Sequence, residues 1–125
     1  MEQLLAHFAG DYLLQSRWMA EEKLKSWTPA VTHGAVYTLP FLFITTDLRA
    51  LAVISITHVF IDHFRLAKVL MWARDRLAPA SHWTDWDVYR TGYGGKPEYV
   101  YFWLMIITDN IMHILINYFA IANWG

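Results

Sequence analysis

The sequence predicts an all-α protein, an integral membrane bundle of about four transmembrane or membrane-embedded helices. Three observations predict this class. A chain of 125 residues is one domain by length, so residues 1–125 are expected to form a single helical membrane domain. The hydrophobic share of 56% exceeds the roughly 45–50% that is usual in soluble domains. Charged residues gather between four apolar segments, which keeps the mean hydropathy at +0.23.

The first two apolar segments lie in the N-terminal half. One runs from about residue 2 to 19, and we expect it to span the membrane or to lie half-embedded at its interface. The other runs from about residue 29 to 46. Pro29 stands where a helix would begin, a position that favours proline. Pro40 lies inside this segment and is expected to kink the helix.

The third segment begins near residue 48, with Asp47 as its predicted N-cap. It is apolar to Phe60, and we expect it to continue as a more charged helix toward Ala78. The fourth segment, from about residue 98 to 124, is the most hydrophobic. Each segment has roughly the 17–25 residues that can cross a hydrocarbon core.

The basic residues predict an orientation for four crossings. Arg49 is the one basic residue outside the first and third connections and their flanks. The positive-inside rule places those connections in the cytoplasm and both termini outside. The alternative is a soluble helical bundle, in which this asymmetry would be accidental. The nine basic residues on the predicted cytoplasmic side are Arg17, Lys23, Lys25, Arg65, Lys68, Arg74, Arg76, Arg90 and Lys96.

Composition excludes several functions. The net charge of −1 gives no reason to expect nucleic acid as a partner. The absence of cysteine excludes disulfides and thiolate metal sites. The connection over residues 79–97 is long, and we interpret it as an aromatic interfacial loop or as a lid or headgroup-binding loop.

Ionisable residues inside the apolar segments are the main functional signal. An Asp at the centre of a membrane helix costs roughly 2.5–3.5 kcal/mol on insertion scales, and this chain carries Asp11, Asp62 and Asp109. A metal or a buried partner would compensate them. Three pairs have i,i+4 spacing, which puts both side chains on one helix face. These pairs are His7 with Asp11, His58 with Asp62, and Asp109 with His113.

The donor set indicates the type of metal site. Imidazole and carboxylate donors without sulfur favour zinc, with manganese or iron as alternatives. Seven ligands are too many for one catalytic zinc and suit two ions bridged by a carboxylate, so we expect one or two divalent ions. Gln15 and Asn110 are expected to orient ligands. We do not expect His63 or His82 to be ligands. The predicted ligands are His7, Asp11, His33, His58, Asp62, Asp109 and His113.

Two resemblances coincide with these residues. His7 to Gln15, Thr57 to Asp62 followed by Lys68, and Asp109 to His113 resemble the domain of unknown function 3307 family over nearly the whole chain. That family consists of small membrane proteins of bacteria and phages, which implies a bacterial inner (cytoplasmic) membrane. Its members typically have Gln where this chain has Asn110.

The segment His7 to Gln15 also distantly resembles a core motif of the zinc-dependent phospholipase C and single-strand nuclease superfamily, and of membrane-bound metal-dependent hydrolases. This resemblance implies an all-helical zinc enzyme in which the predicted ligands hold metal. Ser16 and Arg17 stand where the soluble enzymes have Pro and a further ligand His, which favours one or two ions over three.

The sequence therefore predicts a metal-dependent hydrolase of phosphate esters such as phospholipids. Asp11 or Asp62 would orient or deprotonate the attacking water. Arg65, Lys68 and Arg90 would bind the phosphate. The alternatives are a proton- or metal-ion-conducting protein and a non-enzymatic phage or bacterial membrane factor. The sequence leaves open whether the protein forms a homodimer, because four short helices make only a small bundle.

Overall fold

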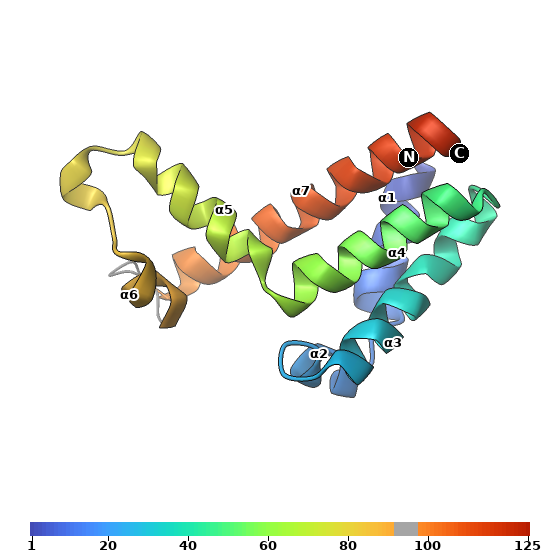
Figure 1. The fold of residues 1–125 in the computed structure, drawn as a ribbon, viewed down its shortest axis with the longest axis horizontal. Helices are drawn as coiled ribbons and strands as arrows, with labels where there is room; N and C mark the ends of the chain where they lie inside the picture. The colour runs from blue at the N-terminus through green and yellow to red at the C-terminus, as the bar shows by residue number, and fades with distance from the viewer. Residues whose placement is uncertain (92–97) are drawn as a thin grey trace.

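The computed structural model describes residues 1–91 and 98–125, and Figure 1 shows their fold. No strand occurs within these residues, so the all-α prediction is confirmed. The elements in chain order are α1 (Glu2–Phe8), the π-helical turn η1 (Ala9–Leu13), α2 (Arg17–Glu22), α3 (Trp27–Thr38), the 3-10 helix η2 (Leu39–Phe43), α4 (Leu48–His63), α5 (Leu66–Arg74), the 3-10 turns η3 (Asp75–Leu77) and η4 (Ala80–His82), α6 (Trp86–Thr91) and α7 (Glu98–Trp124).

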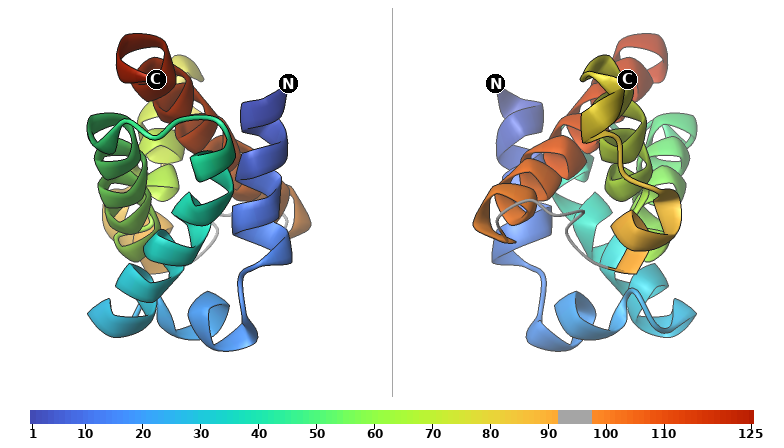
Figure 2. Two further views of the ribbon diagram at one scale, coloured as in Figure 1. Left: turned by 90° about the vertical axis from the view of Figure 1, so that its right-hand side faces the viewer. Right: turned by 90° about the vertical axis from the view of Figure 1, so that its left-hand side faces the viewer.

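The long helix α7 joins two regions of the molecule. Its C-terminal part runs beside α1 and α4, and its N-terminal part lies with α5 and α6 (Figure 1). Figure 2 shows the two chain termini at one end of the bundle and α2 at the other. We call residues 1–63 and 106–125 the bundle region, and residues 64–91 and 98–105 the distal region.

Each region has its own apolar core. In the bundle region, Tyr37, Phe41 and Ile54 are fully buried and pack together. In the distal region, Met71, Tyr89 and Tyr101 form a separate cluster. The side chains that pack against the distal cluster are Trp72, Trp86, Leu104 and Met105. Each of the two cores packs against a different stretch of α7.

The first two predicted segments are divided into shorter elements. The helical run of α1 and η1 ends at Leu13. The chain then starts α2 as a separate short helix, in which the Ser16 hydroxyl accepts a hydrogen bond from the Met19 amide at 3.3 Å. In the second segment, α3 ends at Thr38 and the chain continues through Pro40 as 3-10 helix. Pro40 was expected to kink this helix, and the structure instead shows a change from α-helix to 3-10 helix there, because proline has no amide hydrogen to donate.

The third segment is capped as predicted but does not continue as predicted. The Asp47 carboxylate accepts a hydrogen bond from the Arg49 amide at 2.8 Å, which confirms the N-cap. The expected continuous helix toward Ala78 is wrong: α4 ends at His63, and α5 turns away by 71°. Arg65 lies between them with φ 49° and ψ 52°, a left-handed conformation that ends the α-helical hydrogen-bond ladder.

Among the described helices, one is long and apolar enough to cross a membrane, over Tyr99–Trp124. The bent pair of helices α4 and α5 would provide a second candidate span if the two helices together form one broken span. Four crossings are not confirmed. The helical run of α1 and η1 covers residues 2–13, which reach roughly 18 Å at about 1.5 Å per residue, short of a hydrocarbon core of about 30 Å. The run of α3 and η2 covers residues 27–43 and reaches roughly 28 Å, because 3-10 helix rises about 2.0 Å per residue. The candidate span is consistent with association with a membrane.

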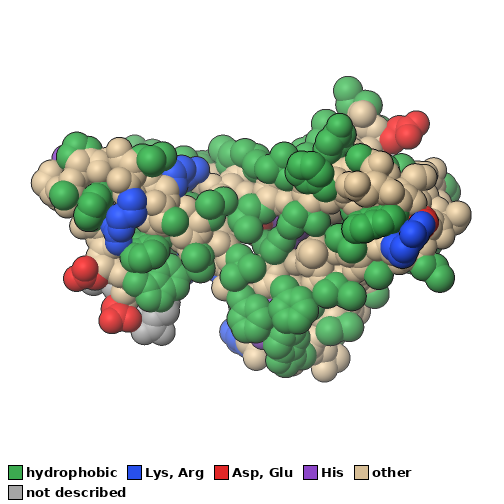
Figure 3. Space-filling model, turned by 45° about the horizontal axis from the view of Figure 1, so that its top comes forward, with side chains coloured by type: hydrophobic (Ala, Val, Ile, Leu, Met, Phe, Trp, Pro, Cys, Tyr) green, Lys and Arg blue, Asp and Glu red, His purple; other side chains and the backbone are tan. Residues whose placement is uncertain are grey.

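Large apolar side chains are nevertheless exposed on several helices. Figure 3 shows hydrophobic side chains spread over much of one face of the molecule. Phe43 is 95% exposed and Leu48 is 80% exposed. An exposed apolar surface of this extent is typical of contact with lipid or with another protein. Further exposed side chains of this kind are Leu5, Leu13, Ile56, Phe60, Ile107, Ile111, Leu115 and Phe119.

Candidate metal centre

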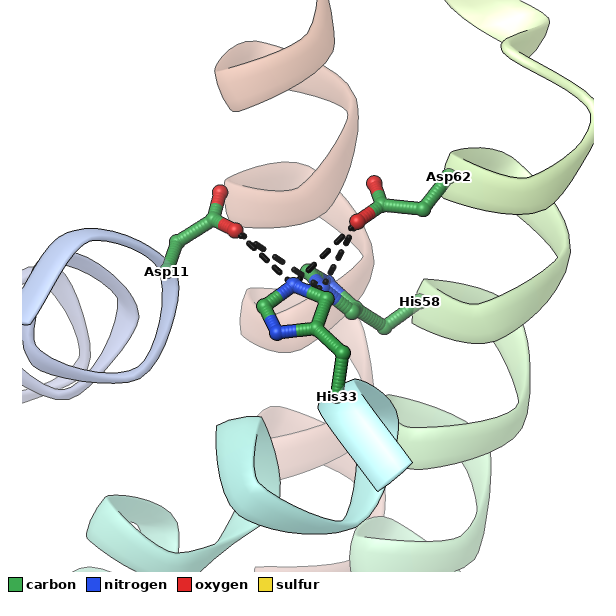
Figure 4. Close-up of side chains that lie close together, drawn as sticks. All are labelled: Asp11, His33, His58 and Asp62. Carbon is green, nitrogen blue, oxygen red and sulfur yellow. Dashed lines mark hydrogen bonds and ion pairs between the residues drawn. The ribbon is translucent and has the colours of Figure 1, made fainter. Parts of the chain in front are cut away.

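Four acidic and histidine side chains from three elements meet inside the bundle region (Figure 4). Asp11 comes from η1 and His33 from α3, while His58 and Asp62 lie one turn apart on α4. Each is at most 6% exposed. The spacing of His58 and Asp62 predicted a shared helix face, and in the structure both side chains reach the same point.

Five distances between the nitrogen and oxygen atoms of this cluster are close to the edges of a tetrahedral metal site, and all four donors lie within 4.8 Å of one another. Nε2 of His33 lies 2.9 Å from Nε2 of His58, 3.2 Å from Oδ1 of Asp11 and 3.2 Å from Oδ2 of Asp62. Nε2 of His58 lies 3.3 Å from the same Asp62 oxygen and 3.8 Å from the same Asp11 oxygen. Tetrahedral zinc with bonds of about 2.0 Å holds its ligands roughly 3.3 Å apart. The residues therefore fit one such ion.

Two glycines allow the elements to approach closely enough for this arrangement. A Cβ on Gly34 would overlap Cγ2 of Val59, so α3 and α4 are in contact beside the two histidines. A Cβ on Gly10 would lie 2.7 Å from the Tyr37 carbonyl oxygen. The adjacent Asp11 sits in a π-helical turn, a rare geometry that is frequent at functional sites.

A second group adjoins the first. Asp11, Asp109 and His113 offer donor atoms within 4.8 Å of one another. Nε2 of His113 lies 3.4 Å from Oδ2 of Asp109 and 3.0 Å from Oδ1 of Asp62. The two oxygens of Asp62 therefore face different groups, as they do in a carboxylate that bridges two ions. The side chain of Asp109 is 26% exposed, so this second group is the more accessible one.

His7 lies beside the cluster rather than in it. Its Nδ1 is 2.7 Å from the Tyr37 hydroxyl oxygen, and its Nε2 is 2.6 Å from Oδ1 of Asn110. The Asn117 amide donates to the same hydroxyl at 2.6 Å, so Tyr37 donates to Nδ1 and His7 donates from Nε2. Both ring nitrogens of His7 are thus engaged in hydrogen bonds. Asn110, expected to orient a ligand, holds His7 in place.

Lys23 contacts the cluster, although sequence reasoning did not select it. Its ammonium donates to Oδ2 of Asp62 at 2.5 Å and to Oε1 of Gln15 at 2.8 Å. The predicted positioning residue Gln15 therefore orients a lysine. His63, also not selected, donates from Nδ1 to the Lys23 carbonyl at 2.7 Å and stacks on Trp27.

A cavity of about 220 Å³ adjoins the cluster. Asp11, Asp62 and Asp109 line it, together with Arg65. Of the other two predicted phosphate-binding residues, Lys68 lies on α5 outside this lining, and the side chain of Arg90 is outside the described residues. The remaining lining residues are Tyr12, Gln15, Lys23, Leu24, Phe102, Met105, Ile106 and Asn110.

The fold and the cluster define an all-α protein whose buried His and Asp side chains fit a divalent ion. The chain belongs to the family described as protein of unknown function (DUF3307), whose model matches residues 1–123. This match confirms the first family resemblance. No curated protein and no solved structure matches the chain, and the likeness to zinc-dependent hydrolases stays a prediction.

Proposed function

We propose that this protein is a membrane-embedded metal-dependent hydrolase that cleaves phosphate esters such as phospholipids. The observation that carries the proposal is the convergence of four buried donors beside a cavity. Three carboxylates outnumber the two cations Lys23 and Arg65 there, and incompletely compensated buried charge is costly, which supports an ion at this point. Histidine and carboxylate donors favour zinc, with manganese or iron as alternatives.

The two groups of donors support different roles for two ions. The four donors of the first group would complete a tetrahedral shell, as in structural zinc sites. Asp11, Asp109 and His113 form the second group, which adjoins the cavity through its two carboxylates and would share Asp11 and Asp62 with the first. We therefore expect one or two ions, with hydrolysis at the second group.

The bound ion would supply Lewis acidity and lower the pKa of water, and the chain would supply the base and the phosphate contacts. Asp11 or Asp62 would orient or deprotonate the water. Asp11 could do so only with one ion bound, because it belongs to both donor groups, and both Asp62 oxygens contact donors, on His113 and Lys23. Arg65 lines the cavity and can form charge-assisted hydrogen bonds with a phosphate.

The proposed location is a bacterial inner membrane, with about four membrane-embedded helices and both termini outside. The exposed apolar side chains and the candidate span in α7 support embedding. The shared end of the two termini and the predominance of basic residues near α2, α5 and α6 support this orientation. Because the run of α1 and η1 is short, we propose that it lies within the membrane without crossing it alone, whereas α3 with η2 is nearly long enough to cross.

Conduction of protons or metal ions is the alternative function. It is favoured by a hydrogen-bonded chain that runs from Tyr12 through Asn110, His7 and Tyr37 to Asn117. A conducting path needs polar groups that reach both faces of the membrane. One turn beyond Asn117, α7 enters the apolar core of the bundle region, which favours hydrolysis.

Metal content of detergent-purified protein, measured by inductively coupled plasma mass spectrometry, tests the proposal. We expect one or two equivalents of zinc or manganese in the wild type, and a loss in Asp62→Asn and His58→Ala. His82→Ala is the matched control, because His82 is exposed on η4.

Metal-loaded wild type should release phosphorylated product from phosphatidylglycerol vesicles. Folded protein that stays metal-free without chelator, and that cannot be reloaded, would contradict the proposal and favour a non-enzymatic membrane factor.

A further inference from the structure

Lys23 is held in the cavity wall from both ends. His63 fixes its carbonyl, and Gln15 and Asp62 accept hydrogen bonds from its ammonium. Its side chain is 16% exposed, which is unusual for a lysine. An oxygen of Asp62 has two lone pairs, so it can accept from this ammonium and still bind an ion. The lysine charge is therefore a fixed feature of the cavity.

Arg65 brings a second positive charge to the same cavity. It is the one non-glycine residue with positive φ among those described, and such a conformation is typical of functional positions. Its guanidinium lies 3.1 Å from Sδ of Met105, a weak acceptor, and no ion pair of Arg65 occurs among the described residues. A guanidinium with so little compensation is available to a ligand.

One part of the cavity lining is apolar. It consists of Leu24 and the α7 side chains Phe102, Met105 and Ile106, whereas Asp109 and Asn110 of the same helix are polar. These α7 residues belong to the candidate span. The cavity thus combines two cations with an apolar wall that lies on the helix expected to contact lipid.

We propose that Lys23 and Arg65 together bind the phosphate of an amphiphilic phosphate ester, with its chain against Phe102, Met105 and Ile106. This rests on the proposed function, since the phosphate would lie beside the metal centre. Three cavity carboxylates outweigh the two cations, so the cavity alone is acidic. Bound divalent ions would make the net charge of the cavity positive. We therefore expect anion binding to depend on metal.

Binding of dodecyl phosphate and of inorganic phosphate, measured by titration calorimetry, tests the pair. The metal-loaded protein is placed in phosphatidylcholine nanodiscs, with empty nanodiscs as the blank. We expect dodecyl phosphate to bind the wild type at least tenfold more tightly than inorganic phosphate. Lys23→Gln and Arg65→Gln should each weaken dodecyl phosphate binding at least tenfold, because a charge-assisted contact is lost. Lys25→Gln, which removes an exposed lysine of the same connection, should stay within about twofold.

Metal content and helical circular dichroism of the same samples separate the possible failures. If folded, metal-loaded Lys23→Gln and Arg65→Gln bind dodecyl phosphate as tightly as the wild type, the role of the two cations is overturned and the proposed function is not. Equal affinity for the two probes would overturn the amphiphile and leave a site for free phosphate. A wild type without metal would overturn the proposed function. Dodecyl phosphate binding that still depended on both cations would then support the pair and overturn its expected dependence on metal. If Arg65→Gln does not fold, Arg65→Lys is used, and it should retain most of the binding.

Discussion

Both regions that share α7 have an apolar core, but within the described residues only the bundle region also holds a cluster of ionisable side chains. In the bundle region, α7 contributes Asp109, Asn110 and His113 to a buried polar cluster. Three turns earlier, in the distal region, the same helix contributes Tyr101 to an apolar and aromatic core around Met71. Buried charge depends on compensation by partners or ions, whereas apolar packing does not. The comparison indicates that only the bundle region should respond to metal.

Asp62→Ala should have the largest effect on the bundle region. It would leave the Lys23 ammonium and three imidazoles without their shared acceptor, and loss of one partner of a buried charge pair typically costs about 3–5 kcal/mol. Metal should be lost as well. Chemical unfolding followed by circular dichroism, with metal analysis, measures both. Glu21→Ala, which removes an exposed carboxylate of α2, should change stability by about 1 kcal/mol or less. Equal effects of the two variants would contradict the importance of the cluster.

Met71→Ala tests the distal region. Met71 is fully buried, and truncation of such a side chain typically costs about 2–5 kcal/mol. Zinc at about a hundred times its Kd should still add about 2.7 kcal/mol, as in the wild type, because the ion binds elsewhere. Unfolding curves with and without zinc measure that increment. If Met71→Ala abolishes it, the two regions are not independent.

Side-chain spacing predicted part of the site correctly and failed where the backbone changes. The pair on α4 and the pair on α7 lie on regular helix, so i,i+4 spacing brought each pair to one point. His7 and Asp11 have the same spacing, but η1 begins at Ala9 and its wider π-helical turn separates the two side chains. The spacing rule holds only for α-helix, which explains why His7 joins the network of Tyr37 instead.

Lys23 and the turn at Arg65 carried no local signal, although Arg65 itself was predicted to bind phosphate. Lys23 reaches Asp62 across 39 positions of sequence, and nothing near it distinguished it from exposed Lys25. The turn at Arg65 has no glycine or proline to mark it, so an unbroken helix was the natural expectation. The all-α class and the apolar segments followed from composition, whereas these tertiary contacts depend on how the elements pack.

Gly34→Ala should separate the two histidines of the cluster. The added methyl would overlap Val59 Cγ2, and a β-branched side chain in a helix cannot easily rotate away. We expect a loss of about 1–3 kcal/mol, typical of overpacking, and weaker zinc binding because α3 and α4 move apart. Competition with a chromogenic chelator measures the zinc affinity. The double variant Gly34→Ala with Val59→Ala removes the overlap and should recover much of that affinity. No recovery would indicate that close packing of these helices does not position the ligands.

Asp47→Asn should have the smallest effect, and it separates general weakening of α4 from loss of the cluster. A hydrogen bond from the Arg49 side chain lowers the pKa of the Asp47 carboxyl to about 2, below its ordinary value of about 3.9. The charge therefore stabilises the folded state above the unfolded pKa, and this contribution is lost as the pH falls toward 2. Asparagine retains the cap but not the charge.

The melting temperature of Asp47→Asn should lie slightly below that of the wild type at pH 7 and converge with it near pH 2, with metal content unchanged at pH 7. A loss of metal in this variant would mean that the cluster responds to any weakening of α4, and the effects of Asp62 substitutions could then not be assigned to coordination.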